Sequence, residues 1–136
     1  MKHQIGKKKL NLKGPHRKAL LRNQTIHFIM YGHLTTTRTT AKEVQRFAEK
    51  LVTLARDGNT FNARRRAQSL LPYKQEALVK LFKDIAPAYV NRPGGYTRLI
   101  PLGRRISDTA NIARLEWVAN ETIATQPAET VVEHKN

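Results

Sequence analysis

Lysines and arginines gathered in short runs are the residues of this chain best suited to chemistry, and that chemistry is phosphate binding. The amino-terminal run, which includes one histidine, consists of Lys2, His3, Lys7, Lys8, Lys9 and Lys13. Ammonium groups at this density neutralise a nucleic-acid backbone and release its counterions. A charged tail that only improves solubility has the same composition, and it is the alternative interpretation of the lysine triplet.

A second run continues the positive charge along the chain. It consists of His16, Arg17, Lys18 and Arg22, and Arg38 follows further on. The planar guanidinium group of arginine binds phosphate through two hydrogen bonds and stacks on exposed bases. We therefore expect these side chains to extend a nucleic-acid contact from the amino-terminal segment onto folded structure.

A triplet of arginines is a third candidate. Arg64, Arg65 and Arg66 point in three successive helical directions, so at least one of them faces away from a core. We take Arg64 and Arg65 as candidate RNA contacts. The alternative is an ordinary solvated helix face.

A glycine turn flanked by arginines and aromatics is the fourth candidate. Arg92, Tyr96 and Arg98 surround Gly94-Gly95. Aromatic and guanidinium planes beside a backbone that allows close approach suit unpaired RNA bases. The alternative is that Tyr96 packs in the core and the glycines only turn the chain.

The sequence offers little for catalysis or metal binding. Its five histidines are scattered, and no two of them form the HxxxH or HExxH pair that would place two imidazoles on one helical face for zinc. The absence of cysteine excludes thiolate nucleophiles and disulfides, and no phosphate loop of the Walker type accompanies the glycines. We expect no enzymatic activity, no cofactor, no metal and no small-molecule substrate.

The charge of the chain is large and uneven. Its formal net charge is +15, and no acidic residue precedes Glu43. A polyanion relieves such repulsion, and nucleic acid is the usual one. DNA and an anionic membrane surface are the competing partners. A flexible arm beside a compact basic domain suits folded RNA better than uniform duplex DNA, and the first helix only loosely has the apolar face that a membrane surface requires.

The apolar stretches are a few residues long, far short of a membrane span. Neither a secretory signal nor a transit peptide is recognisable. We therefore expect no membrane association.

The first half of the chain is expected to be an arm followed by helices. Residues 1–14 have too little apolar surface to offset the entropy of ordering, which predicts an extended basic arm. A helix from Pro15 to Gly32 carries the second run of charge. After an extended segment at 34–37, a capping box at 40–43 opens the clearest amphipathic helix.

The second half is expected to combine two shorter helices with strands. The helices are predicted from about residue 59 to 72 and from 74 to 85, and Pro87 closes the second one. Residues 96–100 and 112–118 have strand patterns and are joined by a polar loop, which favours a hairpin.

These elements predict an α+β fold, in which three to four helices pack with a small, mainly antiparallel sheet. The globular domain is expected at residues 15–118, after the RNA-binding arm at 1–14. Residues 119–136 have no apolar period and are acidic overall, which predicts a disordered acidic tail.

The most specific feature of the sequence is the order of several short motifs. They are Met1-Lys2-His3, Lys9-Leu10-Asn11, His16 to Asn23, Leu34 to Thr37, Ala41 to Val44, Ala48 to Ala55 and Arg92 to Arg98. In this order and spacing, over roughly residues 1–118, they resemble the bacterial and organellar large-subunit ribosomal proteins of the L-seventeen family.

The resemblance implies a function more definite than the composition does. Members of this family are α+β proteins that bind 23S-type ribosomal RNA near the mouth of the polypeptide exit tunnel, beside other large-subunit proteins. Carried over by position, the arm, the first helix and the turn from Arg92 to Arg98 would contact the RNA. Since no transit peptide is recognisable, we expect a ribosome-associated location in the cytoplasm of a bacterium, with an organelle as the alternative.

Overall fold

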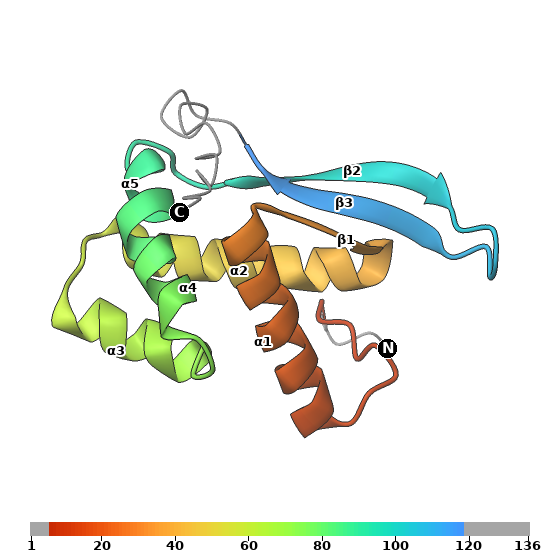
Figure 1. Ribbon diagram of the computed structural model, residues 1–136, viewed down its shortest axis with the longest axis horizontal. Helices are drawn as coiled ribbons and strands as arrows, with labels where there is room; N and C mark the ends of the chain where they lie inside the picture. The colour runs from red at the N-terminus through yellow and green to blue at the C-terminus, as the bar shows by residue number, and fades with distance from the viewer. Residues whose placement is uncertain (1–5, 119–136) are drawn as a thin grey trace, which may run out of the picture.

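The computed structural model describes residues 6–118 (Figure 1). The expectations for Lys2, for His3 and for the tail at 119–136 lie outside the described residues. The helices are α1 (Gly14–Tyr31), α2 (Arg38–Arg56), α3 (Phe61–Leu70), α4 (Gln75–Lys80) and α5 (Ala86–Ala88), and a π-helical segment, η1 (Leu81–Ile85), joins the last two. The strands are β1 (His33–Thr37), β2 (Thr97–Arg104) and β3 (Asn111–Trp117).

Strand β3 is the centre of an antiparallel sheet with the order β1-β3-β2. Leu115 of β3 is paired with Leu34 on one side and with Leu99 on the other. Side chains alternate along β3, because Ala113 and Leu115 are buried whereas Arg114 is exposed. The expected α+β fold with a small antiparallel sheet is confirmed.

Helix α2 runs beneath the sheet and lies at the centre of the core (Figure 1). Its apolar face separates two clusters of buried side chains. One cluster packs α1 and α2 against the sheet through Phe28, Leu34, Val44, Ala48 and Leu115. The other packs α2 against α3, α4 and η1. The ring of Trp117 stacks on Phe28 at 4.2 Å between centroids and closes the end of the sheet.

The expected end of the last helix before Pro87 is wrong, because α5 continues through Pro87 to Ala88. Proline removes a backbone donor, and its ring clashes with the carbonyl four residues earlier. In η1 the backbone is wider, and the N–H of Ala86 donates to the carbonyl of Leu81, five residues earlier. This wider turn makes room for the proline ring without ending the helix.

The expected capping box at residues 40–43 is also wrong. Helix α2 begins at Arg38, and no side chain caps its amino terminus. The hydroxyl groups of Thr37 and Thr40 are hydrogen-bonded to each other at 2.9 Å, while Glu43 bonds a distant part of the chain. Both side chains of the box therefore have other partners.

Candidate nucleic-acid interface

The amino-terminal arm is held on α2 through its backbone. Residues 6–13 form no helix or strand. The carboxylate of Glu43 accepts a hydrogen bond from the backbone N–H of Lys8 at 3.1 Å, and the guanidinium of Arg46 donates to the carbonyl of Gly6 at 2.6 Å. Arg46 and Glu43 are also an ion pair at 3.6 Å. We call these two residues the arm clamp. Because the clamp uses main-chain atoms of the arm, the lysine side chains there stay exposed.

A cleft of about 530 Å³ lies between the arm, the start of α2 and the start of β3 at Ala110 and Asn111. The basic residues that line it are Lys8, Arg38, Lys42 and Arg46. Glu43 is the only carboxylate of the lining, and it is 7% exposed and engaged by the arm. We call this the arm cleft. Its formal charge is strongly positive.

The start of α2 supplies much of that charge. Arg38 and Lys42 are exposed, and neither side chain forms a hydrogen bond or ion pair with any other residue in the 6–118 range. The first turn of α2 contains no acidic residue. Because the first N–H groups of a helix have no partners within it, that end also has a partial positive charge. The arrangement attracts anions.

The start of α1 presents further basic side chains. Lys13, His16 and Lys18 are exposed, and Arg17 is partly buried. The arm runs from α2 to this end of α1 (Figure 1). The basic residues that were expected to bind RNA, from Lys7 to Lys18, therefore extend from the amino-terminal half of α2 to the start of α1.

Arg22 joins α1 to α3. Its Nε donates to the carbonyl of Leu70 at 3.0 Å, and a terminal nitrogen donates to the carbonyl of Ser69 at 3.2 Å. Its guanidinium carbon lies 5.8 Å from the centre of the Tyr73 ring. Carbonyl groups in the last turn of a helix have no partners within that helix. Arg22 therefore completes the end of α3 and has fewer donors left for phosphate.

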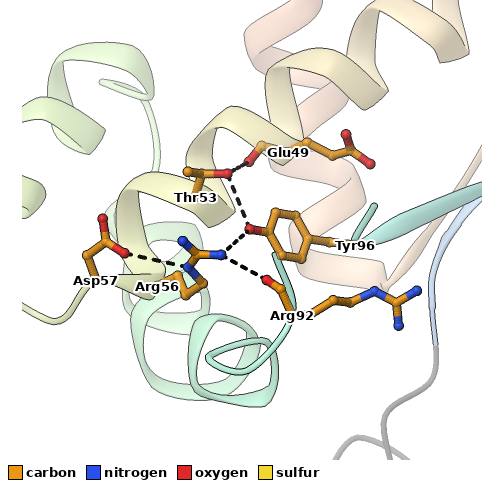
Figure 2. Close-up of polar contacts among 6 residues, drawn as sticks. All are labelled: Glu49, Thr53, Arg56, Asp57, Arg92 and Tyr96. Atoms are coloured by element: carbon orange, nitrogen blue, oxygen red, sulfur yellow. Dashed lines mark hydrogen bonds and ion pairs between the residues drawn. The ribbon is translucent and has the colours of Figure 1, made fainter. Parts of the chain in front are cut away.

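Tyr96 belongs to the core, with 1% of its surface exposed. Its hydroxyl accepts a hydrogen bond from the Arg56 guanidinium at 3.2 Å and lies 3.4 Å from the hydroxyl of Thr53 (Figure 2). The expectation that Tyr96 stacks on an RNA base is wrong, because neither face of its ring is accessible. The alternative interpretation, that it packs in the core, holds.

Arg56 holds the turn before β2 in place. One of its terminal nitrogens donates to the carbonyl of Arg92 at 2.8 Å, and its Nε lies 3.5 Å from a carboxylate oxygen of Asp57 (Figure 2). Arg92 donates in turn to the carbonyl of Gly94 at 3.2 Å. Gly95 has a φ of 63°, which favours glycine. No sequence pattern pointed to Arg56, because its contacts are about 40 residues away along the chain.

Arg98 is exposed but its charge is balanced. It forms an ion pair with Glu116, its partner in the register of β2 and β3, at 2.5 Å. Arg114 lies 3.5 Å from the same carboxylate. Near the hairpin tip, the guanidinium of Arg105 donates two hydrogen bonds to the carboxylate of Asp108, and the backbone N–H of Ala110 donates another. These bonds lower the pKa of Asp108 to about 2. Several arginines of the hairpin thus form ion pairs with carboxylates of the same hairpin.

The arginine triplet lies at the far end of α2 from the arm. All three side chains are exposed on α3, so both the RNA-contact and the solvated-face interpretations stay open. Helix α2 has 19 residues, which is about 28 Å at 1.5 Å per residue. The arm clamp is in its amino-terminal half, whereas α3 follows its carboxyl end. Arg64 and Arg65 therefore do not line the arm cleft.

Two basic residues of the arm cleft were not among the sequence candidates. Lys42 and Arg46 follow Arg38 at intervals of four residues, and this spacing places side chains on one face of a helix. That signal was available in the sequence. The role of Glu43 was not, because its partner Lys8 is 35 residues away.

Over residues 6–118, no helix is long and apolar enough to cross a membrane. In the same part of the chain, no three His, Asp or Glu side chains are grouped so that they could hold a metal ion.

Comparison with known proteins gives one consistent result. The ribosomal protein L17 family matches residues 20–118. The large ribosomal subunit protein bL17 of Desulforudis audaxviator is 45% identical over 114 residues, which are 84% of this chain and 100% of that protein. The proteins of the same name from Borrelia hermsii and Gemmatimonas aurantiaca are 44% and 43% identical over 118 residues, which are 87% of this chain and 94% and 98% of those proteins. The chain belongs to the ribosomal protein L17 family.

Proposed function

We propose that this protein is a structural constituent of the large ribosomal subunit and that it binds and stabilises ribosomal RNA there. Its relatives carry the name of a large ribosomal subunit protein. The observation that carries the proposal is the exposed basic surface of the arm and of the starts of α1 and α2. Over residues 6–46, Glu43 is the only carboxylate, and it is buried.

The mechanism is electrostatic, and it involves no turnover of a substrate. Each phosphate neutralised by a lysine or arginine releases a counterion to the solvent, which favours binding. The arm at 1–14 follows the RNA, and the folded domain at 15–118 holds a rigid basic surface beside it, so that neighbouring RNA segments are locked together. The acidic tail at 119–136 is proposed not to contact RNA.

The residues proposed to carry the contact are Lys7, Lys8, Lys9, Lys13, His16, Arg17, Lys18 and Arg38, together with Lys2 and His3. Arg64 and Arg65 on α3, and Arg92 and Arg98 around β2, are proposed to touch separate RNA segments. Arg22 contributes mainly by fixing α3, because its donors are used within the fold.

The finer assignment rests on family membership. We propose that the RNA is of the 23S type, that the site lies near the mouth of the polypeptide exit tunnel, and that other large-subunit proteins are neighbours. The compartment is then the cytoplasm of a bacterium, which agrees with the bacterial sources of the relatives.

Sedimentation of cell extracts tests the proposal directly. The tagged chain is expected to sediment with the large subunit in a sucrose gradient and to stay there in moderate salt. Crosslinking in cells should then recover large-subunit RNA. Finding the chain in the free soluble fraction, without RNA, would overturn the proposal.

Binding to purified RNA tests the mechanism. Replacing Lys7, Lys8 and Lys9 by Gln is expected to reduce the slope of log affinity against log salt by about two, because each phosphate contact contributes about 0.7 to 0.9. The matched control replaces Lys50, Lys74 and Lys83, three exposed lysines elsewhere. Duplex DNA is the competitor, and it should bind more weakly at equal salt. Equal slopes for the two triple variants would contradict the role of the arm.

A further inference from the structure

We infer that the arm cleft is a specific phosphate-binding site whose occupant is a backbone phosphodiester of RNA, and that the arm has to be docked for the site to be complete. The inference rests on the proposed function, but it concerns one cleft and one phosphate rather than general attraction to RNA. Neither Lys42 nor Arg46 belonged to the basic runs recognised in the sequence.

The composition of the cleft wall is the first argument. Its four basic residues come from two separate segments, the arm and α2, and they face one carboxylate, which leaves a formal excess of three positive charges. The cleft volume of about 530 Å³ is many times the roughly 30 Å³ of a water molecule in the liquid. A phosphate with part of its sugar therefore fits within it.

The unpaired state of two cations is the second argument. Two exposed arginines of the β2–β3 hairpin pair with carboxylates, Arg98 with Glu116 and Arg105 with Asp108. Arg38 and Lys42 have no such partner within residues 6–118. They lie one turn apart beside helix N–H groups that also favour an anion. A bound phosphate would accept hydrogen bonds from both side chains and from these N–H groups.

The arm clamp is the third argument. Glu43 is nearly buried, and its charge is offset by Arg46 and by the N–H of Lys8. A buried carboxylate is costly without such partners, so the arm and the cleft wall stabilise each other. Glu43 is thus a positioning residue, which keeps Lys8 at the cleft without itself binding phosphate.

Salt-dependent binding of the full chain to large-subunit RNA tests the inference. The variant R38Q/K42Q is expected to bind several-fold more weakly, with a salt slope smaller by about one, because one phosphate contact is lost. The matched control K74Q/K83Q removes the same charge at two exposed positions, one directly before α4 and one on η1. Circular dichroism spectra of both variants check that they are folded.

A titration with inorganic phosphate separates the two sources of the ligand. Backbone amide NMR signals of Lys8 and Thr39 are expected to shift saturably in the wild type and to stay fixed in R38Q/K42Q. If the wild type binds RNA and R38Q/K42Q binds it with the control's affinity and slope, the cleft inference fails while the proposed function stands. If phosphate shifts these amides but the wild type ignores large-subunit RNA, the cleft is a site for free phosphate and the proposed function fails.

Discussion

Arginine side chains serve different purposes in this fold, and the partner of each one decides which. Arg22 completes the end of α3, Arg56 holds the turn before β2, and Arg98 is paired across two strands. Arg38 has no carboxylate or carbonyl partner within the described range. Residue type alone therefore did not separate structural arginines from those available to a ligand.

The first prediction concerns Arg22. Changing Arg22 to Ala should lower the free energy of unfolding by about 1 to 3 kcal/mol, because two carbonyl groups of α3 lose their donor. Urea denaturation is the measurement. Arg65→Ala, at an exposed position on α3, is the control and should change stability by less than about 0.5 kcal/mol. Equal effects of the two changes would contradict the role of Arg22.

The second prediction concerns Tyr89, whose hydroxyl donates to the carbonyl of Val118 at 2.8 Å. Burial raises the pKa of Tyr89 to about 12, although the charge of Arg92 opposes the shift. The folded state thus favours the neutral phenol. Its contribution to stability is complete below pH 10, the ordinary pKa, and is lost as the pH rises through about 12.

Tyr89→Phe should therefore cost about 1 kcal/mol at neutral pH, through the lost hydrogen bond. Between pH 10 and 12 the stability difference between the two proteins should shrink. Guanidinium denaturation across this pH range measures it. A difference that stays constant up to pH 12 would show that Tyr89 ionises as readily in the folded state as in the unfolded chain.

Helix α2 forms side-chain contacts with other segments at both of its ends. Its first half binds the arm through Glu43 and Arg46, and its last turn binds the turn before β2 through Arg56. Between them, its apolar face is covered by both core clusters. One helix therefore fixes the spacing between the arm and the opposite end of the domain.

The third prediction concerns the arm clamp. Glu43→Ala should release the arm while α2 stays folded, because the acceptor of the Lys8 N–H is lost. Trypsin should then cleave after Lys7 to Lys9 several-fold faster than in the wild type. Glu49→Ala, on the same helix, should leave arm cleavage unchanged. If the arm of Glu43→Ala is cut no faster, the clamp does not hold it in solution.

Most elements could be predicted from local spacing, whereas several of their ends could not. The apolar period of residues 44–55 indicated α2, and glycine marked the end of α1 at residue 32. The start of α2 was misplaced because Glu43 was read with its neighbour Thr40, although it bonds Lys8. The helix past Pro87 depends on a π-helical turn that leaves no mark in composition.

Only part of the candidate interface could be predicted from the sequence, again because local spacing carries no information about distant contacts. Exposed charge in the arm and at the start of α1 follows from local runs of basic residues. The burial of Tyr96 and the pairing of Arg98 depend on which strand lies beside which. Spacing within one segment cannot supply that information, because it arises from packing between segments far apart in the chain.

Positive charge is the dominant property of this protein. The chain has 25 Lys and Arg against 10 Asp and Glu, and the basic surface of the arm and of the starts of α1 and α2 lacks compensating carboxylates apart from Glu43. Such self-repulsion destabilises a compact state and is reduced by ions in solution. The free protein is therefore less stable in dilute buffer than its packing alone would make it.

The fourth prediction follows from this repulsion. The melting temperature of the free protein should rise by a few degrees between about 20 and 300 mM sodium chloride, because screening weakens the repulsion. Differential scanning calorimetry gives the measurement. K7Q/K8Q/K9Q, with less charge to screen, should show a smaller rise. A melting temperature that falls with salt would mean that attractive ion pairs outweigh the repulsion.

The arm clamp binds backbone atoms that every amino acid except proline possesses, a peptide N–H at residue 8 and a peptide oxygen at residue 6. The position of the arm backbone therefore does not depend on which side chains residues 7 to 9 carry. Substitutions other than proline at positions 7 to 9 can change the affinity for a polyanion while the backbone contacts of the arm clamp stay the same. Anchorage and affinity are thus free to evolve independently in this segment.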